Sequence, residues 1–177
     1  MTNGASLNAA GMHLYRAGRY EEAAARFAEA QTAFIAANHL KAAAESANNR
    51  GLCWRQAARW AEARAALQEA RQVFQSLSDV SGEGQVLGNL GALADSEGDP
   101  RQAAACYLEA ISLLESAGEH DLAQATYTAL SRLKLKQGDW LGAMNAFEEG
   151  LAQLEHPTVA QRLARKLLEA PRKLTGG

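Results

Sequence analysis

The sequence predicts an all-α fold: a right-handed α-solenoid of four helix hairpins with a C-terminal capping helix. Three observations support this class. Equivalent residues recur every 40 positions, apolar residues follow helical spacing within each period, and only three prolines interrupt the 177 residues. We expect residues 1–177 to form a single domain, with repeats at about 4–43, 44–83, 84–123 and 124–156.

The 40-residue period is anchored by Tyr20, Trp60, Pro100 and Trp140. Alanine recurs three positions after each anchor, at Ala23, Ala63, Ala103 and Ala143. Bulky residues recur seven positions after it, at Phe27, Leu67, Tyr107 and Phe147, and small ones nine positions before it, at Gly11, Gly51, Gly91 and Ser131. Small residues let two helix backbones approach, and large residues opposite fill the space between them. The pattern therefore indicates stacked helix pairs.

Each period contains two helical patterns, one before and one after the anchor. Asp99 is a good N-cap with Pro100 at the first helical position, and Gly138 and Asp139 form a similar stop and start. Turn-like segments at 36–40, 76–80 and 116–120 separate the periods. A single hairpin of this kind cannot bury its own apolar stripe, so neighbouring hairpins have to stack.

The last part of the chain differs from the repeats. An apolar stripe of Ala160, Leu163, Ala164, Leu167 and Leu168 predicts the capping helix at 157–170, and we expect 171–177 to be a frayed tail. Residues 156–177 carry five basic and one acidic side chain, against 13 basic and 19 acidic in residues 1–155. This basic end is a solvated surface or a small contact for an acidic partner.

Composition excludes several classes of function. The net charge of −2 argues against general binding of nucleic acid, and no run of 18 apolar residues predicts a membrane span. Two cysteines far apart in sequence, Cys53 and Cys106, do not make a disulfide framework, so we expect a reducing, cytoplasmic location.

The sequence contains no convergent set of catalytic or metal-binding residues. No histidine has a metal-ligand partner three or four positions away, so we expect no metal and no cofactor. Cys53 and His13 occupy equivalent positions in adjacent copies, but no third residue is present to orient a nucleophile. We predict that the protein is not an enzyme.

The repeated pattern resembles the tetratricopeptide repeat over about residues 4–155. The second copy carries Arg50-Gly51, Trp54, Ala58, Trp60, Ala63, Leu67 and Ala70, and the third carries Leu87, Leu90-Gly91, Gly98, Ala103, Tyr107 and Ala110. The usual period of that family is about 34 residues. The 40-residue period therefore places the resemblance with the long-repeat branch. Trp54, Trp60 and Trp140 fall on signature positions, which predicts a packing role.

The resemblance implies that the first helix of each hairpin lines a concave groove that binds peptides. The groove positions that it implies are Asn8, Met12, Asn48, Asn49, Leu52, Arg55, Gln85, Asn89, Asp95 and Arg132. Asn49 and Asn89 are equivalent, and a side-chain amide can donate to and accept from a peptide backbone. A clamp for an acidic chaperone tail would need lysine or arginine where this chain has Asn8, Met12, Gly88 and Ala92.

The leading functional prediction is a non-enzymatic adaptor that binds an extended peptide or a helix of another protein in its groove. Two alternatives are a structural scaffold that self-associates into a homo-oligomer, and a small secretion-type chaperone. The asparagines themselves have an alternative role, which is to form hydrogen bonds only within the scaffold.

Overall fold

The computed structural model describes residues 3–154, which form eight α-helices and no strand. In chain order the helices are α1 (Gly4–Arg16), α2 (Tyr20–Ala36), α3 (Leu40–Gln56), α4 (Trp60–Ser76), α5 (Val80–Glu97), α6 (Pro100–Ser116), α7 (His120–Lys136) and α8 (Trp140–Ala152). The predicted all-α class is confirmed. The predicted capping helix at 157–170 and the tail at 171–177 lie outside the described residues.

The helices begin at intervals that are half as long as the sequence period. From α2 to α8 a helix begins every 20 residues, so each 40-residue period divides into two halves. The predicted start signals are confirmed, since the side chains of Asp99 and Asp139 accept hydrogen bonds from the amides of Gln102 and Gly142. Pro100 occupies the first helical position of α6, where a missing N–H has no cost.

The turns between helices share one geometry. Two positions before each new helix the backbone is left-handed, with φ between 54° and 82°, at Gly18, Asn38, Ala58, Ser78, Gly98, Gly118 and Gly138. The next amide then donates to the carbonyl five residues earlier, as from Asp79 to Phe74 at 2.9 Å. This is the Schellman arrangement, which satisfies the free carbonyls at a helix end. Its repetition fixes the 20-residue spacing.

Glycines make the close contacts within the first three hairpins. A Cβ on Gly11 would lie 3.0 Å from the ring of Phe27, and one on Gly51 would lie 2.6 Å from Leu67. Gly91 faces Tyr107 in the same way, at 2.7 Å. The predicted pairing of small and large residues is therefore the actual helix contact.

The fourth hairpin uses a different contact at the same place. Ser131 replaces the glycine, and its hydroxyl donates to the carbonyl of Ala143 at 2.8 Å. The close approach moves to Gly150, where a Cβ would lie 2.8 Å from that of Tyr127. The departure of this copy from the pattern thus has a local structural reason.

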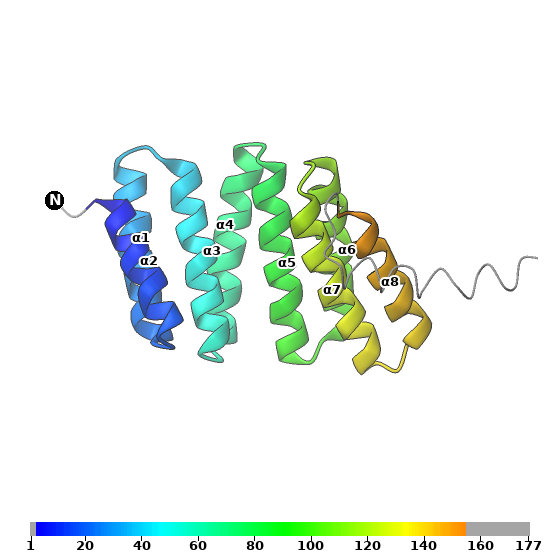
Figure 1. The fold of residues 1–177 in the computed structure, drawn as a ribbon. Coiled ribbons are helices and arrows are strands. Elements are labelled where there is room, and N and C mark those ends of the chain that lie inside the picture. The colour runs from blue at the N-terminus through cyan, green and yellow to red at the C-terminus, as the bar shows by residue number, and fades with distance from the viewer. Residues whose placement is uncertain (1–2, 155–177) are drawn as a thin grey trace, which may run out of the picture.

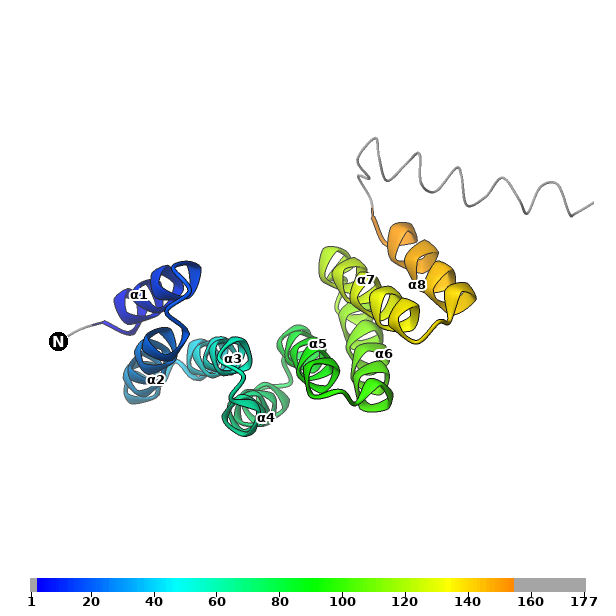
Figure 2. The same cartoon turned by 90° about the horizontal axis from the view of Figure 1, so that it is seen from below.

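The hairpins stack side by side into a curved array (Figure 1). Viewed along the helices, α1, α3, α5 and α7 line the inner side of the curve, and α2, α4 and α6 lie on the outer side (Figure 2). The core is built from alanine, leucine and a few aromatic residues between the two layers.

The packing role predicted for the three tryptophans holds for two of them. Trp54 and Trp60 pack against the central core cluster. The prediction for Trp140 is wrong, because its side chain is 71% exposed at the start of α8. Leu141 beside it is 70% exposed.

Candidate protein-binding groove

The inner side of the array contains a hollow of about 430 Å³ between α3, α5 and α7. Its lining consists of Asn48, Asn49, Leu52, Gln85, Gly88, Asn89, Ala92, Tyr107, Leu114, Leu122, Ala125, Thr126 and Ala129. Five of the ten predicted groove positions are therefore brought together here, all of them on α3 and α5. We refer to this set of residues as the central hollow.

The amides in the central hollow are used unequally. Asn89 donates from Nδ2 to Oδ1 of Asn48 at 2.8 Å, which links α5 to α3. Asn49 has no hydrogen-bond partner within residues 3–154, although it is equivalent to Asn89 in the repeat. The scaffold role considered for the asparagines therefore applies to Asn89, while the amide of Asn49 is available to a ligand.

A second, smaller hollow adjoins the first. It measures about 50 Å³ and is lined by Met12, Tyr15, Phe27, Asn49 and Leu52, from α1, α2 and α3. Asn49 and Leu52 border both hollows. The two hollows are therefore neighbours on the inner side, and the smaller, apolar one lies nearer the N-terminus.

The lining of both hollows is uncharged. None of the lining residues is an acid, a base or a histidine. Burial, followed by the charge of Asp95, raises the pKa of Tyr107 to about 12, so its phenol stays neutral. Two ion pairs join the inner helices near their ends: Lys136 with Asp95 at 2.7 Å and Lys41 with Asp79 at 2.6 Å.

Residues 42–116, which extend from α3 to the end of α6, match the family model described as Tetratricopeptide repeat. The stretch from α3 to α6 therefore carries tetratricopeptide repeats. The match includes the α3 and α5 positions of the central hollow. A comparison with curated proteins finds no match.

Two solved structures show the same kind of fold. BtubC (BKLC) from P. vanneervenii aligns with a TM-score of 0.72 and 20% identity over 88% of this chain and 66% of that one. The APC/C hetero-tetramer Cut9-Hcn1 aligns with a TM-score of 0.50 and 17% identity over 98% of this chain and 38% of that one. This chain thus spans less than two thirds of either structure, and at these identities the likeness concerns the fold.

The remaining predicted positions lie elsewhere on the array. Met12 lines the small hollow, and Asn8 accepts a hydrogen bond from Ser46 at 3.5 Å without lining either hollow. Asp95 is engaged by Lys136. Arg132 is exposed and borders neither hollow.

Arg55 is the one predicted position with a buried polar atom that lacks a hydrogen-bond partner in the described residues. The side chain is partly buried, and its Nε has no hydrogen-bond partner within the described residues. Its charge acts on Tyr107 in the opposite sense to that of Asp95, since Arg55 lowers the pKa of the phenol and Asp95 raises it. Both signs of charge are therefore present near Tyr107.

Several lining residues were not predicted as site residues. Gly88 and Ala92 are equivalent to Asn48 and Leu52 in the 40-residue register, and Ala129 is equivalent to Asn49 and Asn89. The register alone could have found these three. Tyr107 and Leu114 come from the outer helix α6 and reach the hollow between α5 and α7, for which the sequence has no comparable signal.

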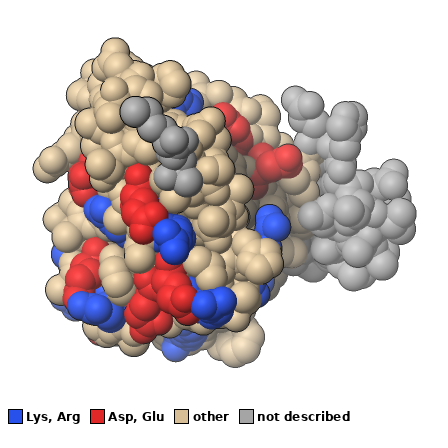
Figure 3. All heavy atoms as spheres, turned by 90° about the vertical axis from the view of Figure 1, so that its left-hand side faces the viewer, with Lys and Arg blue, Asp and Glu red and all other residues tan. Residues whose placement is uncertain are grey.

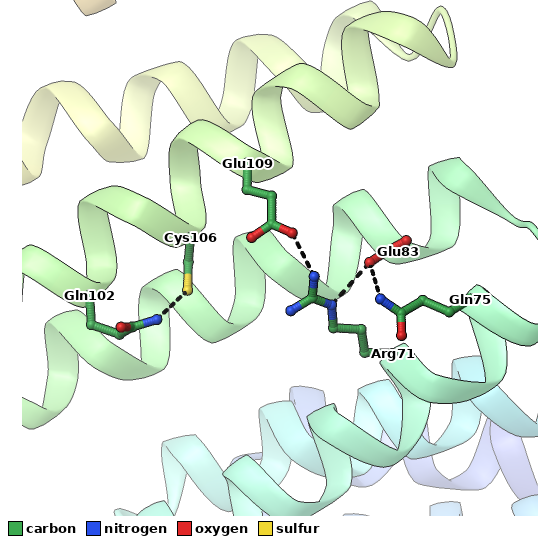
Figure 4. Close-up of polar contacts among 6 residues, drawn as sticks. All are labelled: Arg71, Gln75, Glu83, Gln102, Cys106 and Glu109. Atoms are coloured by element: carbon green, nitrogen blue, oxygen red, sulfur yellow. Dashed lines mark hydrogen bonds and ion pairs between the residues drawn. The ribbon is translucent and has the colours of Figure 1, made fainter.

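The outer side of the array carries most of its ion pairs. Arg71 on α4 contacts Glu83 on α5 at 3.0 Å and Glu109 on α6 at 2.5 Å, and Gln75 also donates to Glu83 (Figure 4). Arg50 bonds Gln31 and Glu69 in the same manner, both at 2.6 Å. Basic and acidic side chains also alternate on the face at the N-terminal end (Figure 3).

These contacts join successive hairpins. Arg50 links the first hairpin to the second, and Arg71 links the second to the third. The last joint has no arginine: Glu115 accepts from Tyr127 at 3.0 Å and from Gln153 at 2.7 Å. The outer side also has a shallow depression of about 420 Å³ on α4. It is lined by Gln68, Arg71, Gln72 and Gln75.

The reactive side chains do not form a catalytic arrangement. Cys53 is fully buried, and this burial raises the pKa of its thiol to about 12, whereas His13 is exposed. A nucleophilic cysteine needs the thiolate form, which is suppressed here. Within residues 3–154 no group of three or more histidine, cysteine, aspartate or glutamate side chains is placed to hold a metal ion. None of the described helices has the length and apolar character needed to cross a membrane.

Proposed function

We propose that this tetratricopeptide repeat array is a non-enzymatic interaction module that holds a segment of a partner protein in its inner groove. Tetratricopeptide repeats serve generally as protein-interaction scaffolds, and the match over residues 42–116 supports that role here. One observation carries the proposal of the groove: two hollows on the inner side share Asn49, whose amide has no partner within the described residues. An apolar recess with a few polar groups at its edge is typical of a ligand site.

An affinity capture with three forms of the protein tests this function. The wild type is compared with an Asn49→Ala/Asn89→Ala variant and with a Gln68→Ala/Gln72→Ala variant, which removes two exposed amides from the outer helix α4. We expect partners from a host lysate to be retained by the wild type and the outer variant and lost by the groove variant. Equal capture by all three forms contradicts a role for the groove.

Self-association is a second candidate, and one surface favours it. Trp140, Leu141 and Met144 lie together near the start of α8, and they are 71%, 70% and 47% exposed. Contiguous exposed apolar residues often mark an interface. Sedimentation of the full chain at increasing concentration tests this candidate. A concentration-dependent dimer that is lost on Trp140→Ser supports it, and a monomer at all concentrations rules it out.

A further inference from the structure

We propose that the groove selects an extended, uncharged peptide segment that places one aliphatic side chain in the small hollow lined by Met12, Tyr15, Phe27, Asn49 and Leu52. This inference rests on the proposed function and specifies the chemistry of the partner. Three features of the described residues carry it: the charge of the lining, the state of the amides and the size of the small hollow.

The uncharged lining selects against charged segments. The thirteen residues of the central hollow include no acid or base. A charged side chain placed in this hollow would lose contacts with water and find no opposite charge in the lining. An acidic or a basic segment therefore binds less well here than a neutral one of the same shape.

The free amide of Asn49 favours an extended backbone over a helix. A side-chain amide offers two N–H donors and one carbonyl acceptor, which matches the donor and acceptor of one peptide unit. In a helical ligand those backbone groups are already bonded to each other. Only an extended segment has its backbone N–H and C=O groups available. Pairing with Asn49 therefore favours extended segments over helices.

The small hollow provides the anchor. Its volume of about 50 Å³ is enough for roughly three to five water-sized groups, the size of a valine or leucine side chain. Three of its five walls are Met12, Phe27 and Leu52, which are apolar. Because Asn49 borders this hollow, a segment that pairs with the Asn49 amide has a neighbouring side chain within reach of it.

Selection from three peptide libraries of equal length tests the class of partner. One library contains only uncharged residues, one is enriched in Asp and Glu, and one is enriched in Lys and Arg. Each is screened on the full chain, and binders are kept only if Asn49→Ala/Asn89→Ala weakens them and Gln68→Ala/Gln72→Ala does not. We expect groove-dependent binders from the uncharged library, with dissociation constants that change less than about twofold between about 0.05 and 0.5 M NaCl.

The other outcomes separate this inference from the function on which it rests. Groove-dependent binders from a charged library, with none from the uncharged one, would contradict the inference of an uncharged partner. They would still support binding in the groove. A lack of groove-dependent binders from every library overturns both the groove and its specificity.

A double-mutant cycle tests the anchor in a selected peptide. Replacing its aliphatic anchor with alanine is expected to weaken binding about tenfold. Met12→Ala in the protein weakens the unmodified peptide but has little further effect on the alanine peptide, because both changes remove the same contact. Independent effects of the two changes contradict the assignment of the anchor to the small hollow. Circular dichroism of Met12→Ala, a half-buried residue, checks that the variant is folded.

Discussion

The outer and inner sides of the array carry different polar chemistry. On the outer side Arg50 and Arg71 each bind two partners, at least one of which belongs to the neighbouring hairpin. On the inner side the hollows are lined by amides, hydroxyls and apolar residues, and Asn49 is left without a partner in residues 3–154. The polar groups of the outer side are thus used for stacking, whereas those of the inner side remain partly available for binding.

Two glycines of α5 give the largest expected contrast. A Cβ on Gly82 would overlap the ring of Phe74, which is 3% exposed at the joint between α4 and α5. A Cβ on Gly88 would meet only Thr126 Oγ1, at 3.7 Å. Gly82→Ala is therefore expected to lower the free energy of unfolding by about 1–3 kcal/mol. Gly88→Ala is expected to raise it by about 0.5–1 kcal/mol, because alanine favours the helix.

Urea denaturation measures both glycine variants against the wild type. If both substitutions change the free energy of unfolding in the same direction, the proposed difference between Gly82 at the joint and Gly88 in the groove is contradicted. A Gly88→Ala variant that is more stable but binds less well would show that Gly88 serves binding at a cost in stability.

The ion pairs of the outer side are expected to have an intermediate effect. Arg71→Ala removes the contacts with Glu83 and Glu109 and is expected to cost about 1 kcal/mol, reduced by solvent screening. Arg101→Ala is the matched control, since Arg101 is exposed on α6 and makes no ion pair within residues 3–154. Thermal unfolding at low and high salt tests this assignment: the cost of Arg71→Ala shrinks at high salt. A cost that does not depend on salt points to packing by the side chain instead.

The cap of α5 gives a smaller, pH-dependent effect. Hydrogen bonds from Lys41, and then from the amide of Gly82, hold the pKa of Asp79 below its usual range. A lowered pKa in the folded state stabilises the fold above the unfolded pKa of about 3.9, and this stabilisation is lost as the pH falls through the folded value. We expect Asp79→Asn, which keeps a capping side chain, to flatten the acid limb of the stability curve.

Denaturation curves recorded from pH 6 down to about pH 2 measure this effect, which spans the ordinary carboxyl range. Asp99→Asn is the control, because Asp99 caps α6 without an ion pair within residues 3–154. Identical acid limbs for the wild type and Asp79→Asn would show that the Lys41 bridge contributes nothing in solution.

The smallest expected effect on stability belongs to Asn49. Asn49→Ala removes no hydrogen bond of the described scaffold, so the free energy of unfolding should change by less than about 0.5 kcal/mol. Asn89→Ala removes the bond to Asn48 and should cost about 1 kcal/mol. Calorimetry of the two single variants distinguishes them, and an equal loss from both would mean that Asn49 also supports the scaffold.

The hairpins could be predicted from sequence because their determinants are local. Gly51 and Leu67, or Gly91 and Tyr107, stand at constant offsets, and this register is a direct consequence of the packing between paired helices. The same register places Asn49 and Asn89 on the inner side. The finer 20-residue spacing was not predicted, since residues as different as Gly18, Ala58 and Ser78 occupy the left-handed position of the turn.

Other features could not be predicted because they depend on neighbouring elements. Trp60 and Trp140 share a register, but Trp60 is followed by another hairpin of the described array and Trp140 is not, so only Trp60 is covered. Asn48 and Asn49 are adjacent in sequence, and it is Asn48, not the equivalent residue Asn49, that meets Asn89. Repetition therefore predicts position on a helix better than it predicts the partner of each side chain.

The most direct test of the inner groove is a nuclear magnetic resonance titration of the labelled full chain with a peptide selected from the uncharged library. Side-chain amide signals of Asn49, Asn89, Gln68 and Gln72 report on the inner and outer sides in one spectrum. We predict that the Asn49 signal shifts most and that the Gln68 and Gln72 signals stay unchanged. Shifts concentrated on Gln68 and Gln72, with Asn49 unaffected, would contradict binding in the groove.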